Sequence, residues 1–191
     1  MLDQSEIIAR LKAGDRSVYA EVVERWQHMI YNTALGIVHN EEDAEDVTQE
    51  VFVTLYEKIG DFREESKLST WLYSITVRKA LDLEKRKKSD KRGGFLKKIF
   101  SVSDRDEPVN FEHPGILLDK KEKASVLFEA LKKLPEKQRI AFTLHKLEGL
   151  SYQEIAAVMN LSLNSIESLQ LRAKNKLKKI LEEYYKHHFK L

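Results

Sequence analysis

The sequence has no cysteine and, among 191 residues, only three prolines and seven glycines. Without cysteine there is no disulfide framework, no thiol nucleophile and no zinc or iron–sulfur site with cysteine ligands. Scarce glycine and proline, together with 42% apolar residues, favour a mostly helical globular protein. There is no run of about eighteen apolar residues and no signal-peptide core. We therefore expect a cytoplasmic protein with no direct membrane insertion.

A large net charge is also lacking, since the formal value is only +2, but the charges are unevenly distributed. Residues 40–50 contain six carboxylates and no base. By contrast, residues 78–98 contain ten lysines or arginines against three acids, and residues 172–191 contain seven against two. This distribution indicates a protein partner for the acidic segment and nucleic acid for the basic ones.

The acidic segment, 40–59, has the spacing of an amphipathic helix. Apolar residues recur every three or four positions along it, at Ala44, Val47, Val51, Leu55 and Ile59. Asn40 can cap this helix, and the acids of its first turn suit the positive end of the helix dipole. Such a charge run is often no more than a solvated helix face. The strongly basic helix that follows favours a functional surface instead.

The remaining pattern predicts an all-α protein of two small domains joined by a linker. From about residue 89 to residue 118 the helical spacing is lost, and Gly-Gly and two prolines appear, as is typical of a linker. We expect its apolar residues to form a short helix or to order only in a complex: Phe95, Leu96, Ile99 and Phe100. The predicted domains are 1–88 and 119–191. The helices expected besides 40–59 are 5–13, 15–39, 71–88 (capped by Ser69 or Thr70), 119–134, 136–147, 151–159 and 162–184.

Residues 151–179 have the pattern of a helix-turn-helix. Ser151 and Glu154 form the capping box S-x-x-E at the start of its first helix. Asn160 tolerates a left-handed turn, and Ser162 can cap the second helix. The major groove of DNA admits a second helix of this kind. The alternative is an ordinary helical hairpin, and Glu167 would place a carboxylate near phosphates.

Two segments of the first half, DAEDVTQEVFVTLYEKI and FREESKLSTWLYSITVRKALD, resemble region 2 of bacterial RNA polymerase sigma factors. The resemblance is to the small extracytoplasmic-function (ECF) group. LKKLPEKQRIAFTLHKLEGLSYQEIAAVMNLSLNSIESLQLRAKNKL is similar to region 4 of the same group. The resemblance implies a sigma factor of the stress-response type that directs promoter-specific transcription initiation, with no enzymatic activity, cofactor or small-molecule substrate. It also implies an anti-sigma factor as a partner.

The resemblance assigns sites to matching positions. The acidic helix would dock on the β′ clamp helices of core RNA polymerase through Asp43, Glu45, Asp46, Gln49, Glu50 and Phe52. The −10 element of promoter DNA, as separated strands, would contact Phe62, Arg63, Lys67, Ser69, Thr70, Trp71, Tyr73, Arg78, Lys79, Lys85 and Arg86. Region 4, which also meets the β flap, would read the −35 element through Ser151, Tyr152, Asn164, Ser165, Ser168, Leu169, Arg172 and Lys174.

Two other classes of protein fit the sequence less well. A metal-dependent helical bundle could use carboxylates of 41–50 with His28 or His39, but di-metal bundles need Glu-x-x-His pairs, and no histidine here has a glutamate three residues before it. A stand-alone helix-turn-helix regulator would account for 151–179. It would leave the acidic helix and the T-W-L-Y segment unexplained.

Overall fold

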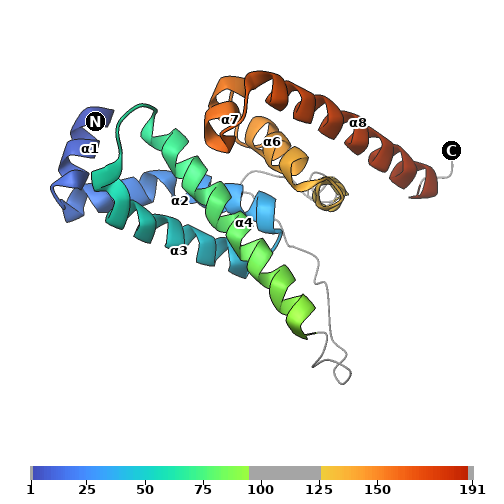
Figure 1. Cartoon of the computed structure of the whole chain (residues 1–191), viewed down its shortest axis with the longest axis horizontal. Helices are drawn as coiled ribbons and strands as arrows, with labels where there is room; N and C mark the ends of the chain where they lie inside the picture. The colour runs from blue at the N-terminus through green and yellow to red at the C-terminus, as the bar shows by residue number, and fades with distance from the viewer. Residues whose placement is uncertain (1, 95–125, 189–191) are drawn as a thin grey trace.

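The computed structural model describes residues 2–94 and 126–188, and within those ranges it is built of α-helices with one 3₁₀ turn and no strand (Figure 1). The all-α prediction is confirmed. The elements of the first half are α1 (Gln4–Lys12), α2 (Arg16–Val38), α3 (Glu41–Lys58), η1 (Ile59–Asp61) and α4 (Leu68–Gly94). Those of the second half are a helical stretch over 126–132, α6 (Glu136–Lys146), α7 (Tyr152–Met159) and α8 (Leu163–His188).

Side-chain caps fix the start of most helices where the sequence predicts them. The side chains of Asp15 and Asn40 accept hydrogen bonds from the first backbone N–H groups of α2 and α3. Ser151 and Glu154 form the full capping box of α7. Asn160 ends α7 in the left-handed conformation, with φ 50° and ψ 52°, and the Ser162 hydroxyl accepts from the N–H of Ser165. These local predictions are confirmed.

The α4 helix is longer at both ends than its periodicity predicts. It begins at Leu68, so Ser69 and Thr70 lie in its first turn and do not cap it. A tertiary contact explains this, because Leu68 is fully buried and its N–H donates to the side-chain oxygen of Gln4 in α1. At the other end the helix continues to Gly94, since lysine and arginine favour helix without needing burial. The linker residues 95–118, with their apolar group, and the predicted start of the 119–134 helix lie outside the described residues.

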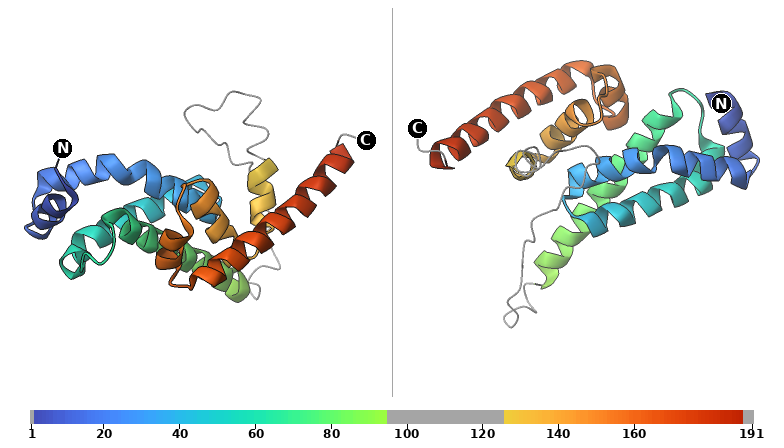
Figure 2. Two further views of the ribbon diagram at one scale, coloured as in Figure 1. Left: turned by 90° about the horizontal axis from the view of Figure 1, so that it is seen from above. Right: turned by 180° about the vertical axis from the view of Figure 1, so that it is seen from behind.

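The two halves of the chain pack directly against each other. The α4 helix contacts α7, and α2 contacts α6, while α3 lies on the other side of α2 and α4 (Figures 1 and 2). A single apolar cluster runs from Ile7 in α1 to Ile166 in α8. A smaller cluster joins the 126–132 stretch to α8 through Leu131, Ala173 and Leu177. Beyond these contacts α8 extends away from the first half (Figure 1).

The two halves approach each other closely at Gly36 in α2. A Cβ atom at this position would lie 2.7 Å from Cγ2 and 3.7 Å from Cβ of Thr143 in α6. Only glycine therefore allows the two helix backbones to come this near at this point. The contact therefore fixes which part of α6 can pack against Gly36 of α2.

Candidate protein-docking and nucleic-acid interfaces

The structure divides the six predicted docking residues of α3 into three sets, which are exposed, paired with α4 or buried. Glu45, Asp46 and Gln49 are exposed. Asp43 and Glu50 turn towards α4, where Glu50 pairs with Lys79 at 3.2 Å and Asp43 pairs with Lys87 at 2.5 Å. Three acidic or amide side chains thus form an open face, which we call the acidic face.

Phe52, the sixth predicted docking residue, belongs to the core. It is 7% exposed, and its carbonyl oxygen accepts a hydrogen bond of 2.9 Å from the Tyr19 hydroxyl. Phe52 can therefore hold α3 against α2 but does not present its ring to a partner in this conformation. Its burial follows from its position beside Val51 and Leu55 on the inner side of α3.

Two exposed apolar residues extend the acidic face towards the C-terminus of α3. Val53 is 55% exposed and Tyr56 is 61% exposed, one and two turns beyond Gln49. The Tyr56 ring rests edge-on against Tyr19, with ring centroids 5.7 Å apart. Sequence reasoning missed both residues. The sequence does contain a signal for them, because both are large apolar residues at positions that do not follow the three- and four-residue spacing of the buried side chains of this helix.

The residues predicted to bind single-stranded DNA lie along α4 and in the loop before it, but they differ in accessibility. Arg63, Lys67 and Arg78 are exposed. Phe62 is buried and stacks on the half-buried Trp71, with ring centroids 4.9 Å apart and an angle of 28° between the rings. The buried set also contains Thr70 and Tyr73. Lys85 and Arg86 are exposed as well, and Ser69 and Lys79 are half-buried.

Tyr73 is buried where α4 meets the second half of the chain. It is 8% exposed, and its hydroxyl donates to Oε2 of Glu148, in the α6–α7 loop, at 3.1 Å. One helical turn and a half earlier, Lys67 donates to Oε1 of Glu154 in α7 at 3.2 Å. Burial and the Glu148 carboxylate raise the pKa of Tyr73, so the phenol stays protonated. Carboxylates of the second half thus occupy two predicted nucleic-acid contacts of the first.

The Tyr73–Glu148 contact has a pH dependence that can be measured. Burial raises the pKa of Glu148 to about 7, although hydrogen bonds from Tyr73 and Thr33 oppose the rise. When the halves separate or unfold, the pKa returns to its ordinary value of about 4.5. The folded protein therefore binds the proton of Glu148 more tightly than the unfolded chain does. This proton stabilises the fold fully at pH values below about 4.5, the pKa in the unfolded chain, and the stabilisation is lost as the pH rises through 7.

We expect Glu148→Gln, which stays neutral, to match the wild type in thermal stability near pH 4.5 and to exceed it at pH 8. The comparison isolates Glu148, because His39 and Glu154 nearby are unchanged between the two proteins. Burial, Arg139 and Lys132 lower the pKa of His39 to about 3, so it stays neutral in the packed state. The measurement is the difference in melting temperature at half-unit steps of pH. A difference that does not vary with pH would contradict the assignment.

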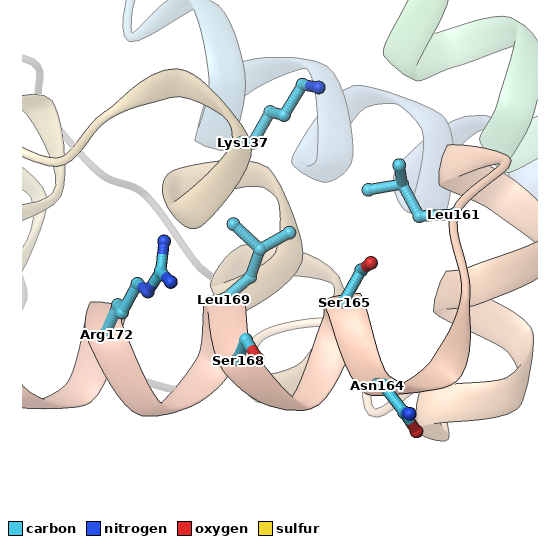
Figure 3. A pocket seen from close by; sticks show the side chains of 7 residues that line it. All are labelled: Lys137, Leu161, Asn164, Ser165, Ser168, Leu169 and Arg172. Carbon is cyan, nitrogen blue, oxygen red and sulfur yellow. The ribbon is translucent and has the colours of Figure 1, made fainter.

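The outward side of the helix-turn-helix gathers most of the residues predicted to read duplex DNA. A hollow of about 400 Å³ is lined by Lys137, Leu161, Asn164, Ser165, Ser168, Leu169 and Arg172 (Figure 3). Five of these seven are predicted contacts, and Lys137 at the start of α6 adds a cation that the sequence did not indicate. Ser151 and Tyr152 lie apart from the hollow, at the start of α7, where the Tyr152 ring packs edge-on against His145. Lys174 is exposed further along α8.

One buried position on the inner side of α8 is occupied by an amide side chain, that of Gln170, and not by an apolar one. Gln170 is 6% exposed, and its side-chain nitrogen donates to the carbonyl oxygen of Ala141 in α6 at 2.6 Å. With Gln170 facing inward, Leu169 is only partly exposed, whereas Leu171 is 62% exposed. The exposed stripe of α8 therefore includes Glu167 and Leu171 beside Ser168 and Arg172.

No helix in the described part of the chain is long and apolar enough to cross a membrane. Among residues 2–94 and 126–188, no three histidine, aspartate or glutamate side chains gather as a metal-binding group.

Comparison with known proteins gives matches to both halves in order. Residues 22–90 match the family model "Sigma-70 region 2", and residues 125–177 match "Sigma-70, region 4". The chain is 30% identical over 179 residues to the RNA polymerase sigma-H factor of Pseudomonas aeruginosa, covering 93% of each protein. It is 31% identical over 182 residues to the ECF RNA polymerase sigma-E factor of Escherichia coli K12, covering 91% of each.

Solved structures agree in fold. The structure of CnrH in complex with the cytosolic domain of CnrY matches with a TM-score of 0.68 and 22% identity, covering 93% of this chain and 96% of that one. The sigma factor RpoE of Bartonella quintana, in complex with the anti-sigma factor NepR, matches with a TM-score of 0.66 and 22% identity, covering 86% and 96%.

Proposed function

This chain belongs to the ECF group of the sigma-70 family and is a sigma factor that directs promoter-specific transcription initiation, and we propose that its two halves divide this work. Residues 1–88 form the domain that docks on core RNA polymerase and engages the −10 element. Residues 119–191 form the domain that reads the −35 element, and 89–118 link the two. The observation that carries the proposal is the match of region 2 and region 4, in order, to the two helical halves.

The acidic face of α3 is the proposed docking surface for the β′ clamp helices. Its open acids would speed and orient association with a basic partner, at a strength that falls with salt. Val53 and Tyr56 add apolar area next to these charges, as an interface needs at its centre. Asp43 and Glu50 act within the protein instead, because they pair with lysines of α4.

The outward stripe of α8 is the proposed reader of the −35 element. Arg172 is suited to a guanine, Asn164 to an adenine, and Ser168 to either a base or a phosphate. Glu167 can accept a hydrogen bond from the amino group of cytosine, and the exposed Leu171 can contact a thymine methyl group. The lysines further along α8 would contact phosphates. Region 4 would also meet the β flap of the polymerase.

Arg172→Ala tests this assignment. If Arg172 contacts a base edge, its loss should weaken −35-dependent binding of the holoenzyme by about 1–3 kcal/mol and relax the preference at one base position. Lys174→Ala is the matched control, since a phosphate contact should weaken binding evenly across sequences and reduce its salt dependence. The measurement is binding to a set of promoters randomised at −35. A loss with Arg172→Ala below about 0.5 kcal/mol would place Arg172 outside the interface.

An anti-sigma factor is the proposed inhibitor. The support is that RpoE, which shares the fold, is in complex with the anti-sigma factor NepR in its solved structure. In our proposal the protein works in the cytoplasm and makes no bonds itself, since the polymerase performs the chemistry. The test removes every membrane-bound partner from the cells and measures the sedimentation and the transcriptional activity of this protein. If both stay unchanged, a membrane-held inhibitor is contradicted.

One experiment tests the proposed function as a whole. The purified protein is mixed with bacterial core RNA polymerase, analysed for co-elution at low salt, and supplied with fragmented genomic DNA from its own source. We expect co-elution and transcripts that start at discrete sites. Sequences aligned upstream of those starts would define the −10 and −35 elements. Absence of co-elution would contradict the docking role of α3.

A further inference from the structure

We propose that α1 is a positioning element for promoter recognition: its residues Gln4 and Lys12 hold the segment 63–67, which we call the reading loop, in the shape that meets the −10 strand. The inference rests on the proposed role of this loop, through Arg63 and Lys67, in binding the −10 element. It adds that the base preference of the loop depends on side chains that do not themselves contact DNA.

The first contact made by α1 is at the end of the reading loop. The side-chain oxygen of Gln4 accepts a hydrogen bond of 3.2 Å from the backbone N–H of Leu68, the first residue of α4. The first N–H groups of a helix have no partner within the helix, and a nearby side chain usually supplies one. Here the acceptor comes from a helix sixty-four residues earlier, and Leu68 itself is fully buried. The contact therefore fixes the point at which the loop ends and α4 begins.

The second contact is at a turn within the reading loop. Glu64 has a φ of 60°, in the left-handed region that side chains like glutamate rarely adopt. Such a backbone persists only where surrounding contacts hold it. Lys12 supplies one of these contacts, since its Nζ donates to Oε1 of Glu64 at 3.2 Å. The two side chains are 34% and 42% exposed, so the ion pair adds little to the stability of the whole protein. Its effect is on the direction in which the loop turns.

The start of the reading loop is also fixed in place. Phe62, the residue before it, is buried and stacks on Trp71 with ring centroids 4.9 Å apart. The preceding turn, η1, packs on α1, which lies beside the loop (Figures 1 and 2). Arg63 and Lys67 are therefore exposed cations on a backbone that is held at both ends and at its turn. Misplacing such groups by about 1 Å is enough to weaken a specific contact severely.

Both contacts made by α1 lie entirely within the first half of the chain. The second half also touches the reading loop, because Lys67 pairs with Glu154 of α7 at 3.2 Å. That pair depends on where α7 lies. The contacts from α1 do not, so α1 can keep the loop in shape while region 4 occupies a −35 element.

The test is a comparison of base preferences at −10 and at −35. The full-length protein with core polymerase transcribes a library built on one of the promoters found in the discrete-start experiment, randomised at −10 in one set and at −35 in another. The variants are Gln4→Ala, Lys12→Ala and the two combined. Arg10→Ala is the matched control, because it removes a cation and an ion pair from the same helix. Its partner, at 2.8 Å, is Asp15, which caps α2 and is not part of the loop.

We expect the combined variant to relax the preference at one or more −10 positions by about three- to tenfold, with the −35 preference unchanged. Gln4→Glu keeps an acceptor oxygen and Lys12→Arg keeps a cation, so both should retain the wild-type preference. The charge exchange Lys12→Glu/Glu64→Lys should recover what Lys12→Glu alone loses. The melting temperature of Lys12→Ala should change by no more than about 3 °C, which a purely structural role would not combine with an altered preference.

An unchanged −10 preference in the combined variant would overturn the proposal. An equal relaxation at −35, or in Arg10→Ala, would overturn it as well, since the effect would then be general. If the combined variant does not fold, the decision passes to Lys12→Ala against Lys12→Arg, and equal −10 preferences in these two overturn the proposal. If the wild type starts no transcription at discrete sites, the proposed function itself fails and this inference fails with it.

Discussion

Arg139→Ala is expected to destabilise the folded protein by about 3 kcal/mol, because it leaves the largely buried carboxylate of Glu84 with only the exposed Lys88, at 3.8 Å, as a partner. Arg139 is 7% exposed, and its side chain donates to both oxygens of Glu84 at 2.9 Å. The measurement is urea unfolding followed by circular dichroism and by tryptophan fluorescence. Since both tryptophans lie in the first half, a loss seen by both methods would show that the two halves unfold together.

A surface ion pair on α8 provides the control for this prediction. Lys178 pairs with Glu182 at 3.7 Å, and both side chains are largely exposed. Lys178→Ala should change the free energy of unfolding by less than about 1 kcal/mol. The double variant Arg139→Met/Glu84→Met should recover much of the stability, because an apolar pair of similar volume removes both charges. An Arg139→Ala variant as stable as Lys178→Ala would contradict a structural role for the buried pair.

The combined change Asp46→Arg/Gln49→Ala is expected to weaken binding to core polymerase by roughly 3 kcal/mol, or more than a hundredfold in Kd. It puts a positive charge in the centre of the acidic face, opposite a partner surface that we propose to be basic. Asp46 and Gln49 are both exposed, so the melting temperature should stay unchanged. The measurement is titration of labelled protein with core polymerase at several salt concentrations.

The matched control is Glu24→Arg/Gln27→Ala on α2. It makes the same change in charge at the same spacing of three residues, on exposed positions of another helix. If association depended only on overall charge, the two double variants would behave alike. Unchanged affinity for Asp46→Arg/Gln49→Ala would show that the docking surface lies elsewhere, and Val53 and Tyr56 would then be tested separately.

The predictions from sequence succeed where the cause is local. The caps at Asp15, Asn40 and Ser151 and the left-handed turn at Asn160 depend on side chains within three residues of the backbone groups that they satisfy. Helix spacing likewise separates the buried Val47 and Val51 from the open Asp46 and Gln49. Both kinds of evidence can be read from a single segment of the chain.

The predictions that the structure corrects are those that depend on contacts between segments far apart in the sequence. The start of α4 at Leu68 depends on Gln4, and the burial of Tyr73 depends on a loop seventy-five residues later. Nothing near Gln170 in the sequence indicates that its amide bonds to the carbonyl of Ala141. The side of α3 on which each predicted docking residue lies decides whether it is open to a partner, and Phe52 lies on the side that packs in the core.

The apolar cluster that runs from Ile7 to Ile166 has a consequence for the order of events during protein synthesis. The first half is complete at Gly94, and the last residue of the cluster is added about seventy residues later. At 5–20 residues per second the ribosome takes roughly 4–14 s to cover that distance. During this interval the nascent first half has no region 4 to shelter it. The side of α4 that we propose to bind the −10 strand, and part of the apolar surface, are then open to chaperones, to an inhibitor or to the polymerase itself.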